Sequence, residues 1–97
     1  MKTHILLPAV LLSLALSGAA SAECYADYKA KKDNPLRLHY GVIELPDPAC
    51  GSRTDAAREI DRRIGRGGWQ LLNVMSIFGG DGLAQRKSSA GAFYLKY

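Results

Sequence analysis

The chain has 97 residues, with thirteen Lys and Arg against nine Asp and Glu, a formal net charge of +4 and two cysteines. This length allows one small domain, which buries proportionally little surface and gains from a crosslink. The modest positive charge lacks the dense basic runs with interleaved aromatic residues that are typical of nucleic-acid-binding proteins. We therefore expect no nucleic-acid partner.

The segment 1–22 has the pattern of a secretory signal peptide. A basic start at Lys2 precedes an apolar run over residues 5–16, and small residues lead to a cleavage site after Ala22. An uncleaved membrane anchor would need roughly 20 apolar residues, and this run is shorter. Cys24 does not indicate a lipoprotein, because Glu23 precedes it where a small residue is needed. We expect a cleaved signal, a periplasmic or secreted product and no stable membrane anchor.

The segment 23–35 is rich in Tyr, Ala and Lys, which favours a short helix that ends at the Asp33-Asn34-Pro35 run. Cys24 lies in this segment, and Cys50 lies in a loop that contains Pro and Gly. In an oxidising compartment the two cysteines predict a disulfide that ties the segment to a domain formed by residues 36–97. A redox or metal pair is the alternative, but redox pairs usually lie two residues apart and metal sites need three or four ligands.

The first expected strand covers residues 36–45, where apolar and polar residues alternate. One face of this strand is predicted to be buried, formed by Leu36, Leu38, Tyr40 and Val42. His39 lies between these positions and is the one histidine left after signal removal. A lone histidine in a strand is more often structural than a general base, so we assign no catalytic residue.

A helix is predicted after the Cys50 loop. Ser52 or Thr54 can cap its first turn, and Asp55 there complements the helix dipole. Its apolar face consists of Ala56, Ala57, Ile60 and Ile64.

Three arginines spaced four residues apart form a stripe on another face of this helix: Arg58, Arg62 and Arg66. Such a stripe can bind an anion. Alternatively it is a solvated helix face of mixed charge, because Glu59 and Asp61 lie within reach of the arginines.

The glycines of the run RIGRGGWQLL do not form a phosphate cradle. A phosphate loop precedes a helix, whereas Gly67 and Gly68 follow one, at the end where the dipole is negative. One of them is expected to be the left-handed residue that ends the helix. Trp69 then packs as an apolar plug between helix and sheet, with a ligand-stacking platform as the alternative.

A second strand is predicted over Gln70–Phe78, then a polar connection over residues 79–91 and a last strand over residues 92–97. The connection carries Arg86 and Lys87, and we expect it to be a mobile hairpin loop. Its Asp81 is too isolated for a calcium site, which takes six to eight oxygens. We expect the last strand to lie in the middle of the sheet and to expose Tyr94.

A Gly-Trp turn that leads into a strand is the most distinctive pattern of the chain. It is accompanied by Ile64, Gly65, the Gly68-Trp69-Gln70-Leu71 run, Val74 and the terminal Phe93-Tyr94-Leu95-Lys96 run. On these residues, the stretch 36–97 resembles a family of small bacterial domains, the domain of unknown function 4177 type. The resemblance implies a compact α+β fold and supplies no activity or site residues.

These patterns predict an α+β fold in which one main helix packs on a small three-stranded, mainly antiparallel sheet, in the order strand, helix, strand, strand, with a disulfide-tethered N-terminal helical segment. Two exposed sheet edges would allow a homodimer. We expect a non-catalytic interaction module without cofactor or metal. Its candidate surface consists of Arg58, Arg62, Arg66, Arg86, Lys87 and Tyr94. The partner would be a protein or an anionic envelope component, including an envelope enzyme that the module inhibits; a small periplasmic enzyme is the alternative.

Overall fold

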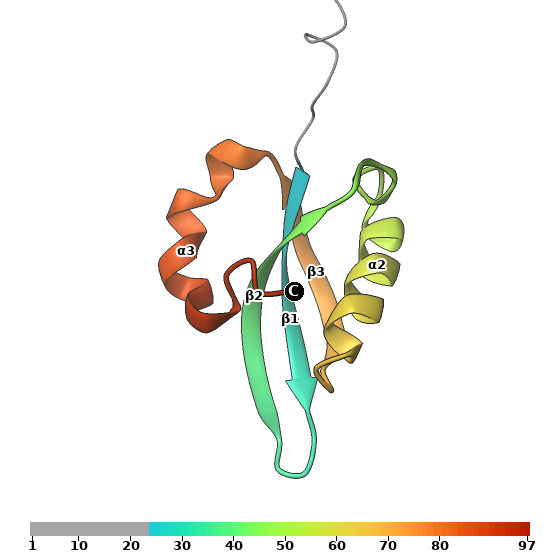
Figure 1. The fold of residues 1–97 in the computed structure, drawn as a ribbon, viewed down its shortest axis with the longest axis vertical. Helices are drawn as coiled ribbons and strands as arrows, with labels where there is room; N and C mark the ends of the chain where they lie inside the picture. The colour runs from blue at the N-terminus through green and yellow to red at the C-terminus, as the bar shows by residue number, and fades with distance from the viewer. Residues whose placement is uncertain (1–23) are drawn as a thin grey trace, which may run out of the picture.

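The computed structural model describes residues 24–97, and the predicted signal peptide lies outside them. Three strands, β1 (Cys24–Lys32), β2 (Arg37–Leu45) and β3 (Gln70–Phe78), form one antiparallel sheet in the order β2-β1-β3. Helix α2 (Arg53–Gly65) and helix α3 (Ala84–Ala90) flank the sheet (Figure 1). Short 3-10 turns cover Asp47–Ala49, Gly80–Gly82 and Gly91–Phe93. The expected α+β class with a three-stranded antiparallel sheet is confirmed.

The main core lies between the sheet and α2. It combines small residues of the central strand, such as Ala26 and Ala30, with Ile60 and Ile64 of the helix, and all four are fully buried. The alanines of β1 leave room for the helix to approach closely. Tyr28 fills the remaining space by lying across Gly41 of β2, where an added Cβ would meet the tyrosine ring at 2.5 Å.

Both ends of α2 are fixed by the residues that the sequence indicated. The Ser52 hydroxyl accepts a hydrogen bond from the Asp55 N–H at 3.1 Å, which caps the first turn. After the last turn, Gly68 adopts a left-handed conformation with φ 83°, and the Trp69 N–H donates to the Ile64 carbonyl. Trp69 itself is 9% exposed and belongs to the core.

The predicted disulfide is confirmed. Cys24 and Cys50 are joined with a Cα–Cα separation of 6.1 Å, and residues 24–97 contain no free cysteine. The crosslink joins the start of β1 to the loop that precedes α2. Loop closure of this length stabilises a small domain by roughly 3 to 4 kcal/mol.

The prediction of a helix in the N-terminal segment is wrong. Residues 24–32 form β1, the central strand, which pairs with both β2 and β3. Ala, Lys and Tyr tolerate a helix, but here tertiary pairing outweighs the local preference. The part of the chain after the predicted cleavage site is therefore built into the sheet and is not an appendage to it.

The prediction of a C-terminal strand over residues 92–97 is also wrong. The backbone of residues 94 and 95 pairs with the outer edge of β2 through a single parallel bridge between Val42 and Tyr94 and a 2.8 Å hydrogen bond from the Leu95 N–H to the Val42 carbonyl. The expected central position of this segment is taken by β1. Phe93 and Tyr97 pack on the α2 face, where Phe93 stacks on His39, whereas Tyr94 lies beside Lys87 of α3.

The expected hairpin loop over residues 79–91 contains α3. This short helix packs against the sheet face opposite α2, with Ala90 buried (Figure 1). The sequence is polar here because most of its side chains face solvent. The predicted buried face of residues 36–45 is wrong at its beginning, since Leu36 and Leu38 are 64% and 66% exposed while His39 is buried.

Candidate functional site

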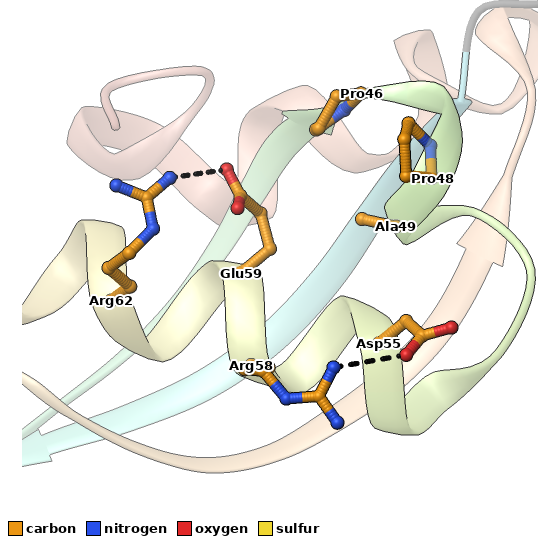
Figure 2. A pocket seen from close by; sticks show the side chains of 7 residues that line it. All are labelled: Pro46, Pro48, Ala49, Asp55, Arg58, Glu59 and Arg62. Atoms are coloured by element: carbon orange, nitrogen blue, oxygen red, sulfur yellow. Dashed lines mark hydrogen bonds and ion pairs between the residues drawn. The ribbon is translucent and has the colours of Figure 1, made fainter.

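The arginine stripe of α2 is partly neutralised within the helix. Arg58 pairs with Asp55 at 3.1 Å and Arg62 pairs with Glu59 at 2.8 Å. The two pairs line a shallow groove of about 420 Å³, which the prolines of the preceding turn close on the other side (Figure 2). The hydrogen bond from Arg62 holds the pKa of Glu59 below its usual value, so the carboxylate stays charged beside the arginine. The groove thus presents alternating charges to a ligand.

Arg66 lies apart from this groove, on the turn after α2. Within residues 24–97 it forms no ion pair. This turn adjoins the end of β1, because the Lys32 side chain lies across Gly68 with its Cε 3.1 Å from where a Cβ would be. The stripe therefore divides into two paired arginines and one that lies near the end of the sheet.

Arg86, a second candidate surface residue, points inward. Its Nε donates to Asp27 Oδ2 at 3.0 Å, its Nη1 donates to the Gly82 carbonyl at 2.7 Å, and its guanidinium lies 3.9 Å from the centre of the Phe78 ring. Arg86 thus fastens α3 to the sheet. Its neighbour Lys87 is exposed and lies 5.7 Å from the Tyr94 ring.

Asp27 is the centre of a polar cluster on the α3 face of the sheet. Besides Arg86, it accepts hydrogen bonds from the hydroxyls of Tyr40 at 2.8 Å and Ser76 at 2.6 Å. Burial raises the pKa of Asp27, but these hydrogen bonds and the charge of Arg86 outweigh it and leave the pKa below its usual value. Burial and the hydrogen bond to Asp27 raise the pKa of Tyr40 to about 12. The carboxylate is charged and accepts from three donors, one at Oδ1 and two at Oδ2.

His39 is the centre of an aromatic cluster on the α2 face. Its ring stacks on Phe93 at 3.7 Å between centroids and meets Trp69 edge-on at 4.3 Å. Nε2 lies 3.0 Å from the Tyr28 hydroxyl, and Nδ1 is buried without a hydrogen-bond partner. Burial, with smaller effects from Lys32 and Lys96, lowers the pKa of His39 to about 4. The imidazole is therefore neutral at pH 7.

The turn end of the β1–β2 hairpin brings together residues of two segments that are predicted as separate elements, 23–35 and 36–45. Cations flank two exposed leucines on both faces of the sheet. We call this set the hairpin-end surface: Lys29, Lys31, Lys32, Leu36, Arg37 and Leu38. Beside it, a hollow of about 250 Å³ is lined by Lys29, Leu38 and the half-exposed Leu72, among others. Apolar and basic groups thus meet at one end of the molecule.

The cations on the α2 side of this surface lie against an aromatic ring. Lys32 Nζ lies 4.6 Å from the centre of the Trp69 ring, and the guanidinium carbon of Arg37 lies 5.8 Å from it. On the other side, Lys31 pairs with Asp33 at 3.4 Å, and Lys29 has no ion pair within residues 24–97. The surface therefore carries four cations beside one carboxylate.

The described part of the chain contains no group of three or more His, Cys, Asp or Glu that could hold a metal ion. Comparisons with known proteins found no matching family model, no matching curated protein and no matching solved structure. The resemblance to the domain of unknown function 4177 type therefore stays a prediction.

The structure brings Lys87 and Tyr94 together, and Arg58 and Arg62 together, but it does not join the candidate residues into one surface. The sequence signal for the hairpin-end surface was present: two leucines and four cations surround the Asn34-Pro35 breaker. It was missed because residues 24–32 were expected to be a helix, and this expectation separated the lysines from the strand that pairs with them.

Proposed function

We propose that this protein is a small exported binding module, without catalytic activity, that contacts an anionic partner through its hairpin-end surface. The observation that carries the proposal is the mixture of four cations with two leucines that are about two-thirds exposed. Exposed apolar groups rimmed by charge are typical of interaction sites. Here the positive charge selects a partner of opposite sign.

The buried titratable groups support a binding role rather than acid–base catalysis. Asp27 has its oxygens occupied by three donors, and His39 is enclosed by aromatic rings with its pKa at about 4. A general base needs access to a substrate proton and a pKa near the working pH. Neither group meets both conditions, and both contribute to packing instead.

Export is supported by two observations of different kinds. The sequence begins with the pattern of a cleaved signal peptide, and the Cys24–Cys50 disulfide is typical of oxidising compartments. No helix in the stretch 24–97 is long and apolar enough to cross a bilayer. N-terminal sequencing of the protein from fractionated cells tests this part, with Glu23 as the expected first residue and Met1 as the contrary result.

Binding to immobilised polyanions, both polyglutamate and anionic lipid, tests the proposed surface. We expect the double variant Lys29→Glu/Lys31→Glu to lose at least tenfold in affinity for whichever polyanion binds, because each cation near an anionic surface contributes about 1 kcal/mol. Lys87→Glu is the matched control at an exposed lysine on α3. Equal affinities for the wild-type protein and the double variant would refute the assignment of the surface.

A further inference from the structure

The hairpin end extends beyond both helices. In Figure 1 the turn between β1 and β2 projects past the ends of α2 and α3, so this part of the sheet is not covered by a helix. Leu36 lies on the turn and Leu38 lies two residues along β2, with 64% and 66% of their surfaces exposed. Two leucines at a projecting end can move from water into an apolar environment without any rearrangement of the core.

The cations surround these leucines and lie at similar distances from the turn. Lys31 pairs across the ladder with Leu38, and Lys32 pairs with Arg37. Lys31 and Leu38 therefore lie on one face of the sheet, and Lys32 and Arg37 lie on the other. Lys29 lies one step further from the turn, on the Lys31 face. An object that surrounds the turn would meet positive charge from both sides.

On these grounds we propose that the partner is the surface of an anionic lipid bilayer, into which Leu36 and Leu38 insert while the lysines and Arg37 contact the lipid headgroups. This inference rests on the proposed function and names its partner. Long cationic side chains can keep their charge in the headgroup layer while their stems lie along apolar groups. Apolar burial and attraction to anionic lipids act together in this kind of reversible attachment.

The convex shape favours a bilayer over an acidic peptide or folded protein. A folded partner has to supply a concavity that matches the projecting turn, whereas lipids rearrange around it. A peptide strand would need a free sheet edge, and the Val42–Tyr94 bridge limits the free part of the outer edge of β2 to the residues between the turn and Val42. The bilayer uses both the exposed leucines and the cations on the two faces of the hairpin.

Co-sedimentation with vesicles tests the inference. The protein is used as isolated from cells with its disulfide intact, and every variant carries the same N-terminus, so any contribution of residues 1–23 is common to all. Vesicles of phosphatidylglycerol mixed with phosphatidylcholine are compared with vesicles of phosphatidylcholine alone. Soluble glycerol phosphate and polyglutamate are competing ligands that supply the charge without the bilayer. We expect binding to the anionic vesicles, weakened by salt and little affected by glycerol phosphate.

Two pairs of variants separate charge from insertion. Lys29→Glu/Lys31→Glu should weaken vesicle binding by more than tenfold, and Leu36→Ser/Leu38→Ser should weaken it by about tenfold, because partial burial of two leucines is lost. The controls are Lys87→Glu and Leu95→Ser, each of which makes one such substitution at an exposed position away from the hairpin end, so effects are compared per substituted residue. Circular dichroism and thermal unfolding verify that each variant is folded.

Three results would overturn the inference in distinguishable ways. Vesicle binding that is unaffected by the leucine variants would rule out insertion. Binding to polyglutamate that depends on Lys29 and Lys31, without vesicle binding, would replace the bilayer by an acidic protein and leave the proposed function intact. Failure to bind any of these polyanions would remove both proposals.

Discussion

The two faces of the sheet bury a titratable side chain in opposite ways. On the α3 face, Asp27 keeps its charge because it has an arginine and two hydroxyls as partners. On the α2 face, His39 gives up its charge because aromatic rings surround it and nothing compensates a buried cation. The difference matches the helices: the seven-residue α3 offers little apolar surface and depends on an ion pair, whereas the thirteen-residue α2 is held by packing.

Removal of the Asp27 carboxylate is the largest expected perturbation. Asp27→Ala should lower the free energy of unfolding by about 3 kcal/mol, because the partly buried Arg86 loses its counterion and the hydroxyls of Tyr40 and Ser76 lose their acceptor. Urea unfolding followed by circular dichroism measures the loss. Asp55→Ala, which removes an exposed ion pair, is the control and should cost about 1 kcal/mol or less.

The double variant Asp27→Ala/Arg86→Met shows whether the unpaired arginine is responsible. It should recover part of the loss, since it removes the uncompensated charge and keeps an apolar side chain against Phe78. A double variant that is no more stable than Asp27→Ala would contradict the assigned role of the ion pair on the α3 face.

Acid should act on the α2 face before it acts on the α3 face. The folded-state pKa of His39 is about 4, below its ordinary value of 6.5, so the unfolded state binds the proton more readily and stability falls as the pH drops from 6.5 to 4. The loss is about 3 kcal/mol. Asp27 has a pKa that is lowered from 3.8, so the stability that its carboxylate provides is lost only at a lower pH than the range in which His39 is protonated.

Urea midpoints measured at intervals between pH 7 and pH 4 test the order of these two losses. His39→Gln keeps a polar side chain within reach of the Tyr28 hydroxyl but does not titrate, so its midpoint should vary less over this range. An equally steep dependence in the variant would show that another group controls the acid response.

A smaller loss of stability is expected from substitution of Arg63, a charged residue on the α2 face. Arg63 donates from Nη1 to the Glu44 carbonyl and from Nη2 to the Tyr97 carbonyl, both at 2.7 Å, and so joins the helix, β2 and the C-terminal segment. Arg63→Ala should cost about 1.5 to 3 kcal/mol, because these are hydrogen bonds from a charged group that is largely buried. Thermal unfolding should separate it from Arg62→Ala, whose exposed pair is worth about 1 kcal/mol at most.

The smallest change in stability is expected at the outer edge of β3. Two side chains of α2 already occupy backbone groups there: Asp61 accepts from the Leu71 N–H at 3.1 Å, and Arg53 donates to the Met75 carbonyl at 3.0 Å. Asp61→Ala/Arg53→Ala should cost about 1 kcal/mol but raise self-association severalfold, because a bare strand edge pairs with other edges. Light scattering after size-exclusion chromatography measures the self-association. A mass distribution equal to that of the wild-type protein at matched concentrations would contradict the prediction.

Local signals predicted the parts of the fold that depend on neighbours in sequence. Helix α2 with its Ser52 cap, the Gly68 turn and the bounds of β3 follow from periodicity and capping chemistry. Strand β1 was missed because its buried face consists of small residues such as Ala26 and Ala30, which favour a helix when taken alone. Their role as contact points for α2 exists only after the sheet has formed.

The candidate surface was harder to predict, because exposure depends on the tertiary structure. Arg86 looks like a solvated loop residue in sequence, yet its partner Asp27 lies 59 positions away. Leu36 and Leu38 have the alternation of buried strand residues, but no helix covers the end of the sheet where they lie. Long-range partners and uncovered ends are invisible to a pattern that counts spacing along the chain.

The disulfide also determines how the domain would respond to tension. Cys24 and Cys50 are 26 positions apart, and the segment between them contains β1, β2 and their turn. A pulling force applied at residue 24 passes directly to residue 50 through the crosslink, so roughly 90 Å of chain cannot be extended. The stretch that can lengthen begins after Cys50 and includes both helices and β3. The hairpin that carries the proposed membrane contact therefore remains a short closed loop even when the remainder of the domain is drawn out.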